Sequence, residues 1–156
     1  SSRIASRVAE LQAFNTMVEP HIGAVAIHVP SPDDAQSARL DVSAAAFLEA
    51  ANRVSESLHG VPAQHVFVVS HDPGMVNEVQ ALVRKGVTVE SLVAPHEEPG
   101  STAAIVTMLA HIEVARRAPM LVSTQSSFFG RLVQALRTAH PQTAVDVATH
   151  APLMLL

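Results

Sequence analysis

The most constraining feature of this sequence is its alternation of short apolar runs with longer stretches of helical periodicity. The apolar runs have the length and composition of buried strands and lie at residues 22–29, 66–70, 87–93, 120–124 and 144–148. The stretches between them have helical spacing and lie at residues 43–58, 73–85, 101–117 and 127–140, with a further one at 2–18 before the first run. Because strand and helix alternate, we predict an α/β, Rossmann-like parallel sheet with helices on both faces.

The composition agrees with a core of this kind. Apolar residues make up 48% of the 156 residues, whereas aromatic residues make up 3%, and there is no Trp or Tyr. The core must therefore consist mainly of Val, Leu, Ile and Ala, which suits strands buried on both faces. A chain of this length suits one domain with one core, over residues 1–156. It starts at Ser1 without Met, so we expect it to be a piece of a longer protein.

Charge and residue usage exclude several classes of function. The net charge is −4 with only 10 Lys and Arg, so no basic stripe can neutralise the phosphates of a nucleic acid. There is no Cys, which removes disulfides and thiolate chemistry. Nine His residues invite a zinc interpretation, but no H-x-x-x-H or H-E-x-x-H pattern occurs, and we predict no metal site. No apolar run approaches the roughly 20 residues that a transmembrane helix needs.

Polar residues follow the predicted strands, at the edge where parallel sheets bind ligands. The strongest candidate for an anion-binding site comprises Thr124, Ser126 and Ser127, which follow a strand and open a helix. The N–H groups of that first turn would favour a phosphate, and Arg131 one turn later could add positive charge. A plain helix cap at Ser126 or Ser127 explains the same pattern and is the commoner case. No glycine-rich phosphate-binding loop accompanies it.

Other strand ends carry weaker candidates. His28, near the end of the first strand, could reach a ligand, although a lone His in an apolar strand is usually a core residue. His71 lies in the loop after the second strand. Asp72 beside it could bind a ribose hydroxyl or act as a base, but the local pattern favours a helix cap before Pro73. Asp33 follows the first strand, in a cluster that more often forms a solvated turn.

Three of these strand-end segments follow one another in a characteristic order. They are residues 27–33 (IHVPSPD), 69–73 (VSHDP) and 123–131 (STQSSFFGR). In that order they resemble the motifs of the donor-binding C-terminal domain of GDP-fucose-dependent fucosyltransferases, of the α-1,6-fucosyltransferase and protein O-fucosyltransferase types. The resemblance extends from about Ile22 onward. The second and third segments carry most of it.

The resemblance implies a function and a set of roles. The donor would be GDP-fucose, bound without a cofactor or metal, and the sugar would pass to a hydroxyl of a glycan or protein acceptor. The donor-binding residues would be His28 at the guanine base, His71, Asp72, His111, Thr124, and Ser126 and Ser127 at the diphosphate. Asp33 and Arg131 are the candidates for catalysis. Eukaryotic members of the family act in the secretory lumen, such as the Golgi, and bacterial members in the cytoplasm.

The sequence also departs from the family pattern. Pro30 and Ser31 occupy the positions of two arginines that would neutralise the departing diphosphate. Loss of such a cation can cost several kcal/mol of transition-state stabilisation. His71 and His111 stand where the family has Asp, and the family's acceptor-side domain has no counterpart here. Two alternatives therefore stay open: a catalytically inactive relative with a structural or protein-binding role, and an unrelated α/β domain.

Overall fold

The computed structural model describes residues 23–30, 43–70, 72–91, 100–124, 127–137 and 143–152. The predicted helix at 2–18 lies outside these residues. In chain order the elements are β1 (Ala24–His28), α2 (Ala44–His59), β2 (His65–Val69), α3 (Pro73–Leu82), β3 (Thr88–Ser91), α4 (Thr102–Arg117), β4 (Met120–Ser123), α5 (Phe128–Leu136) and β5 (Ala144–Asp146).

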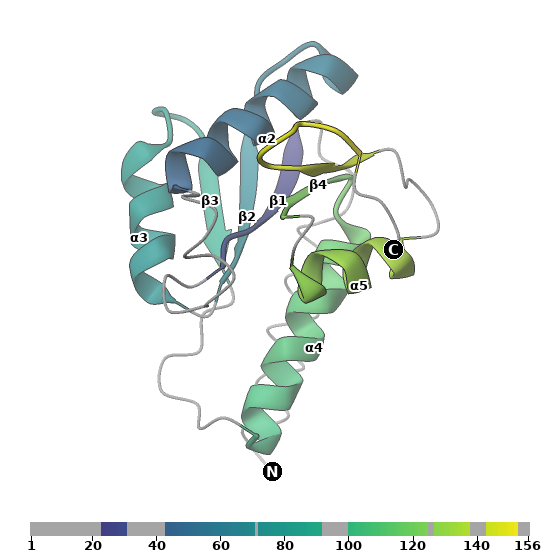
Figure 1. Ribbon diagram of the computed structural model, residues 1–156. Helices are drawn as coiled ribbons and strands as arrows, with labels where there is room; N and C mark the ends of the chain where they lie inside the picture. Colours follow the sequence, from purple (N-terminus) through teal and green to yellow (C-terminus); the bar gives the residue numbers. More distant parts are fainter. Residues whose placement is uncertain are drawn as a thin grey trace.

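The strands form one five-stranded sheet in the order β3-β2-β1-β4-β5, and every neighbouring pair is parallel (Figure 1). This confirms the predicted Rossmann-like fold class. The strand order reverses between β1 and β4, so the connections that leave these two strands run to opposite sides of the sheet. Ligands of open parallel sheets bind in the crevice at the carboxyl ends of such a strand pair.

Helices cover both faces of the sheet, as predicted. Successive residues of a strand point to opposite faces. On β1, Val25 and Ile27 pack in the cluster of α2 and α3, whereas Ala24 and Ala26 pack in the cluster of α4 and α5. Figure 1 shows α2 and α3 on one side and α4 and α5 on the other. No helix of the described part is both long and apolar enough to cross a membrane.

Helix starts were predicted more accurately than helix ends. The side chains of Ser43 and Ser101 cap α2 and α4, each accepting from the N–H three residues later at 3.2 Å. The sequence predicts that α3 ends near Lys85, and this is wrong: the helix ends at Leu82. Gly86, expected just past the helix end, instead adopts φ +93° in the turn before β3.

The last helix is also shorter than expected. The sequence predicts a helix to about residue 140, whereas α5 ends at Leu136 and Arg137 occupies its C-cap position. The reason is tertiary: Arg137 leaves helical geometry at φ −83° and ψ 89°, and its guanidinium bonds to carbonyls of another segment. Residues 138–142 lie outside the described part.

Candidate functional site

A row of polar side chains crosses the carboxyl edge of the sheet at the point where the strand order reverses. Ile27 lies opposite Val122, so the next residues, His28 and Ser123, are neighbours on β1 and β4. The Nδ1 atom of His28 lies 3.2 Å from the Oγ atom of Ser123. The sheet register thus brings together two residues that are 95 positions apart in the chain.

Phe129 of α5 also contacts His28. The two rings are stacked, with centroids 4.2 Å apart and an interplanar angle of 23°. Together, the stacking and the contact with Ser123 orient the imidazole on the α5 side of the sheet. The sequence prediction gave His28 a role, whereas Ser123 and Phe129 lay in the third motif, residues 123–131, without an assigned role. A signal for Phe129 existed, because the pair Phe128-Phe129 directly follows Ser126-Ser127 in a chain that is poor in aromatic residues.

The first turn of α5 presses unusually closely on the end of β4. A Cβ atom added at Gly130 would lie 2.5 Å from Ser123 Oγ and 3.0 Å from the carbonyl oxygen of Thr124. Real Cβ atoms essentially never approach other heavy atoms within 3.0 Å, so only glycine permits this contact. Thr124 is buried, and its carbonyl oxygen accepts a hydrogen bond from the Ser127 N–H at 3.0 Å. The start of α5 is therefore fixed directly beside Ser123.

Ser127 caps α5, which is the commoner of the two roles that the sequence allowed. Its Oγ atom accepts a hydrogen bond from the Gly130 N–H at 3.3 Å. Arg131 follows one turn later, is partly exposed, and forms no ion pair with any residue in the described ranges. A helix N-terminus with a nearby cation favours an anion electrostatically. Ser126 lies outside the described residues.

Asp72 caps α3, as the local pattern favoured. Its Oδ1 atom accepts from the Gly74 N–H at 2.8 Å, and its own N–H donates to Ser70 Oγ at 3.2 Å. Pro73 occupies the first turn of the helix, where its missing N–H costs nothing. A ribose or base role for Asp72 stays a prediction. His71 and Asp33 lie outside the described residues.

His111 is buried in α4, with 2% of its surface exposed. It lies six residues before the helix end at Arg117, or about 9 Å along the axis. The strand β4, which follows that end, rises about 10 Å from Met120 to Ser123. The role of His111 at the guanine base remains a prediction.

Asp146, which the sequence prediction missed, lies opposite Ser123 at the end of β5. Its Oδ2 atom accepts hydrogen bonds from the N–H of Thr149 at 2.9 Å and from the hydroxyl of Thr149 at 3.0 Å. These bonds hold the turn that follows β5. They give Asp146 a structural role, at a position where the sequence alone suggested nothing more than a strand.

Arg137 lies at the opposite, amino edge of the sheet and was not predicted. One guanidinium nitrogen donates to the carbonyls of Ala115 and Ala118 at 2.8 and 2.7 Å. The other donates to Pro119 at 3.2 Å and to the hydroxyl of Thr143 at 2.7 Å. Only 5% of the residue is exposed, and burial lowers the pKa of Arg137 to about 10. It ties the end of α4 to the starts of β4 and β5, which is a structural role.

No group of three or more His, Asp and Glu side chains with the geometry to hold a metal occurs in the described part of the chain.

Comparisons with known proteins relate this chain to others by fold. No protein-family model matches the sequence, and no curated protein matches it. Among solved structures, the apo form of POFUT1, a GDP-fucose O-fucosyltransferase, matches with a TM-score of 0.52 and 19% identity over 94% of this chain. POFUT1 in complex with GDP gives 0.54 and 18% over 94%. The complex with GDP-fucose gives 0.52 and 17% over 95%.

These matches cover only 46–47% of each POFUT1 chain, so this chain spans about half the length of the solved proteins that it resembles. At this level of identity the likeness shows the fold alone. The chain has a fucosyltransferase-like Rossmann fold.

Proposed function

We propose that this chain is the donor-binding domain of a fucosyltransferase-like glycosyltransferase and binds a GDP-sugar at the carboxyl edge between β1 and β4. The observation that carries the proposal is the junction of His28, Ser123 and the capped start of α5 at the reversal of strand order. The support from comparison is that POFUT1, which has a similar fold, has been solved with GDP and with GDP-fucose.

The diphosphate would bind at the start of α5. The free N–H groups of a first turn point toward such an anion, and the helix dipole favours its charge. Ser127 and Ser126 would add hydroxyl donors, and Arg131 would add a cation one turn away. His28, oriented by Ser123 and Phe129, would meet the guanine base together with His111. Asp72 would contact the nucleotide from the end of β2.

Transfer of the sugar would require stabilisation of the charge that develops on the departing diphosphate. We assign this role to Arg131 and to the first turn of α5, and the activation of the acceptor hydroxyl to Asp33. The acceptor would be a glycan or a protein hydroxyl. Residues 1–156 would form one nucleotide-sugar-binding domain that works with other domains of a longer protein.

A second candidate is an inactive relative that binds the nucleotide but does not transfer a sugar, and serves structure or partner binding instead. The observation that favours it is Pro30, two residues after the end of β1, at a position where the resembling family has a cation. The two candidates share the same nucleotide site, so they differ in turnover and not in binding.

The test is a calorimetric titration of the protein with GDP and GDP-fucose, with UDP and ADP as controls. The Ser127→Ala variant should bind GDP several-fold more weakly, because it loses a hydroxyl donor and the cap that orders the first turn. Ser43→Ala is the matched control: Ser43 caps α2 with the same geometry, and its loss should leave GDP binding unchanged.

Selective binding of guanine nucleotides that weakens only in Ser127→Ala supports the donor site. Absence of nucleotide binding at millimolar concentration overturns it. Release of GDP from GDP-fucose then separates the two candidates. An active enzyme loses it in Arg131→Gln, whereas an inactive relative never shows it.

A further inference from the structure

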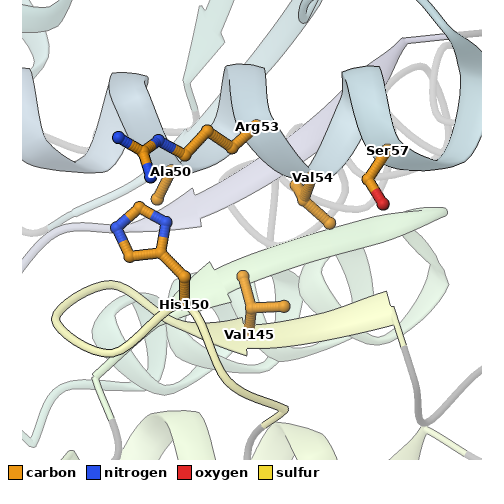
Figure 2. Close-up of a pocket in the computed structure, with 6 residues that line it drawn as sticks. All are labelled: Ala50, Arg53, Val54, Ser57, Val145 and His150. Atoms are coloured by element: carbon orange, nitrogen blue, oxygen red, sulfur yellow. The ribbon is translucent and has the colours of Figure 1, made fainter.

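A cavity lies on the face of the sheet opposite α5, between α2 and the edge strand β5. Its volume is about 200 Å³, and it is lined by Ala50, Arg53, Val54, Ser57, Val145 and His150 (Figure 2). Val145 packs with the α2 side of the core, whereas Ala144 before it packs with the α4 and α5 side. The cavity shares no residue with the proposed donor site.

The lining of this cavity changes from one end to the other. Figure 2 shows the guanidinium of Arg53 and the ring of His150 at one end, and the hydroxyl of Ser57 at the other. Val54 and Val145, each 9% exposed, lie between them. Along α2, the backbone positions of Arg53 and Ser57 are separated by about 6 Å, the rise over four residues. The cavity thus has a cationic end, an apolar middle and a hydroxyl end.

The backbone at His150 is unusual. It is the one non-glycine residue of the described ranges with a positive φ, at 57°. His is tolerated in this region better than most residues, but the conformation still costs free energy and persists where surrounding contacts hold it. Here the His150 N–H donates to the Asp146 carbonyl at 2.8 Å, and the Asp146 carboxylate binds Thr149. This bonded turn directs the imidazole toward α2.

The guanidinium of Arg53 can accept a further partner at little cost. It donates to Glu49 Oε1 at 2.6 Å, but both side chains are more than 60% exposed, at 62% and 61%. Ion pairs with such exposure contribute little free energy. A guanidinium has five N–H donors, and one contact with Glu49 leaves others for an anion in the cavity.

We propose that this cavity binds a small organic carboxylate with an apolar chain. The carboxylate lies between Arg53 and His150, and the chain lies along Val54 and Val145 toward Ser57. Cavities of about 300–1,000 Å³ hold drug-sized molecules, so a space of about 200 Å³ suits a smaller ligand. The geometry of an arginine fork matches a carboxylate through two parallel hydrogen bonds.

The test is a titration followed by NMR amide shifts with three probes: hexanoate, hexanamide and acetate. Hexanoate carries both charge and chain, hexanamide the chain without the charge, and acetate the charge without the chain. Hexanoate should shift the amides of Val54, Val145 and His150 in a saturable way. The other two probes should bind about tenfold more weakly, which corresponds to the loss of about 1.4 kcal/mol.

Two variants and one control locate the binding. Arg53→Gln removes the charge, and His150→Asn removes the imidazole while keeping a residue that tolerates positive φ. Each should weaken hexanoate binding several-fold. Arg84→Gln, on an exposed residue between α3 and β3, should leave it unchanged.

Three results would each overturn the proposal. The first is equal affinity for hexanoate and hexanamide, and the second is equal affinity of the Arg53→Gln and Arg84→Gln variants for hexanoate. The third is the absence of a saturable shift at the amides of Val54, Val145 and His150. A GDP titration monitored at His28 and Ser127 reports on the donor site separately, so failure of one site is distinguishable from failure of the other.

Discussion

The two ends of helix α5 differ in burial and in how their hydrogen bonds are satisfied. At its C-terminal end, Arg137 is buried and its guanidinium makes four hydrogen bonds that join α4, β4 and β5. At its N-terminal end, Ser127 is partly exposed and satisfies one backbone N–H, and the close approach at Gly130 sets the turn beside Ser123. A helix leaves several N–H groups unbonded at its start. The buried end serves stability, and the other end leaves N–H groups for the anion of the proposed donor site.

Replacement of Arg137 by Met should have the largest effect on stability. The change removes the donor to the buried carbonyls of Ala115 and Ala118, at a cost of about 3 kcal/mol in the free energy of unfolding. Urea denaturation measures it. Arg131→Met, on the same helix but partly exposed, should cost less than about 1 kcal/mol and is the matched control. Equal losses in the two variants would contradict the contrast between the ends.

Replacement of Gly130 by Ala tests the close approach at the N-terminal end of α5. The added Cβ atom would meet Ser123 Oγ and the Thr124 carbonyl, so α5 must shift, at about 2 kcal/mol. Gly74→Ala is the control, since Gly74 also lies in a first turn but its added Cβ would meet only side-chain atoms of Asp72. We expect that control to lie within about 0.5 kcal/mol of the wild type in thermal unfolding. If Gly130→Ala left the stability unchanged, the close contact of α5 with the end of β4 would be contradicted.

Replacement of Ser127 by Ala should separate stability from binding at the same end. Loss of the cap should cost about 1 kcal/mol, as it should for Ser43→Ala on α2. Only Ser127→Ala should also weaken GDP binding, because Ser43 caps a helix on the other face. Parallel denaturation and calorimetry on both variants measure the two effects. If GDP binding weakened in both variants, the cause would be a general loss of stability and not the loss of a contact at Ser127.

Replacement of Glu113 by Gln should have the smallest effect. The hydrogen bond from Arg116, with help from Arg117, lowers the pKa of the Glu113 carboxyl. A lowered pKa contributes stability above the ordinary value of 4.5, and this stability is lost as the pH falls through the lowered value. At neutral pH we expect a loss of about 0.5 kcal/mol in the variant, and the two unfolding curves should converge in acid. A stability difference that is independent of pH would show that the ion pairs of Glu113 with Arg116 and Arg117 are not its cause.

Much of the fold was predictable because its signals are local. The apolar runs and helical spacings indicated the strands and helices, and the caps at Ser43, Asp72, Ser101 and Ser127 follow from side-chain bonds to residues two or three positions away. The predicted ends of α3 and α5 were both wrong, and at α5 the long-range hydrogen bonds of Arg137 decide where the helix ends. Of the residues that meet at the proposed site, the sequence analysis assigned roles to His28, Thr124 and Ser127, whereas Ser123 and Phe129 had only a place in the third motif.

The sequence by itself therefore determined the class of fold, the starts of the helices and the polar strand ends, because these depend on periodicity and on neighbours within one helical turn. The tertiary structure decided which strand ends meet. The contact of His28 with Ser123, the seat of Gly130 against β4, the burial of Arg137 and the cavity between Arg53 and His150 all depend on strand order and helix placement. No short stretch of sequence encodes that order, because it results from the packing of the whole sheet.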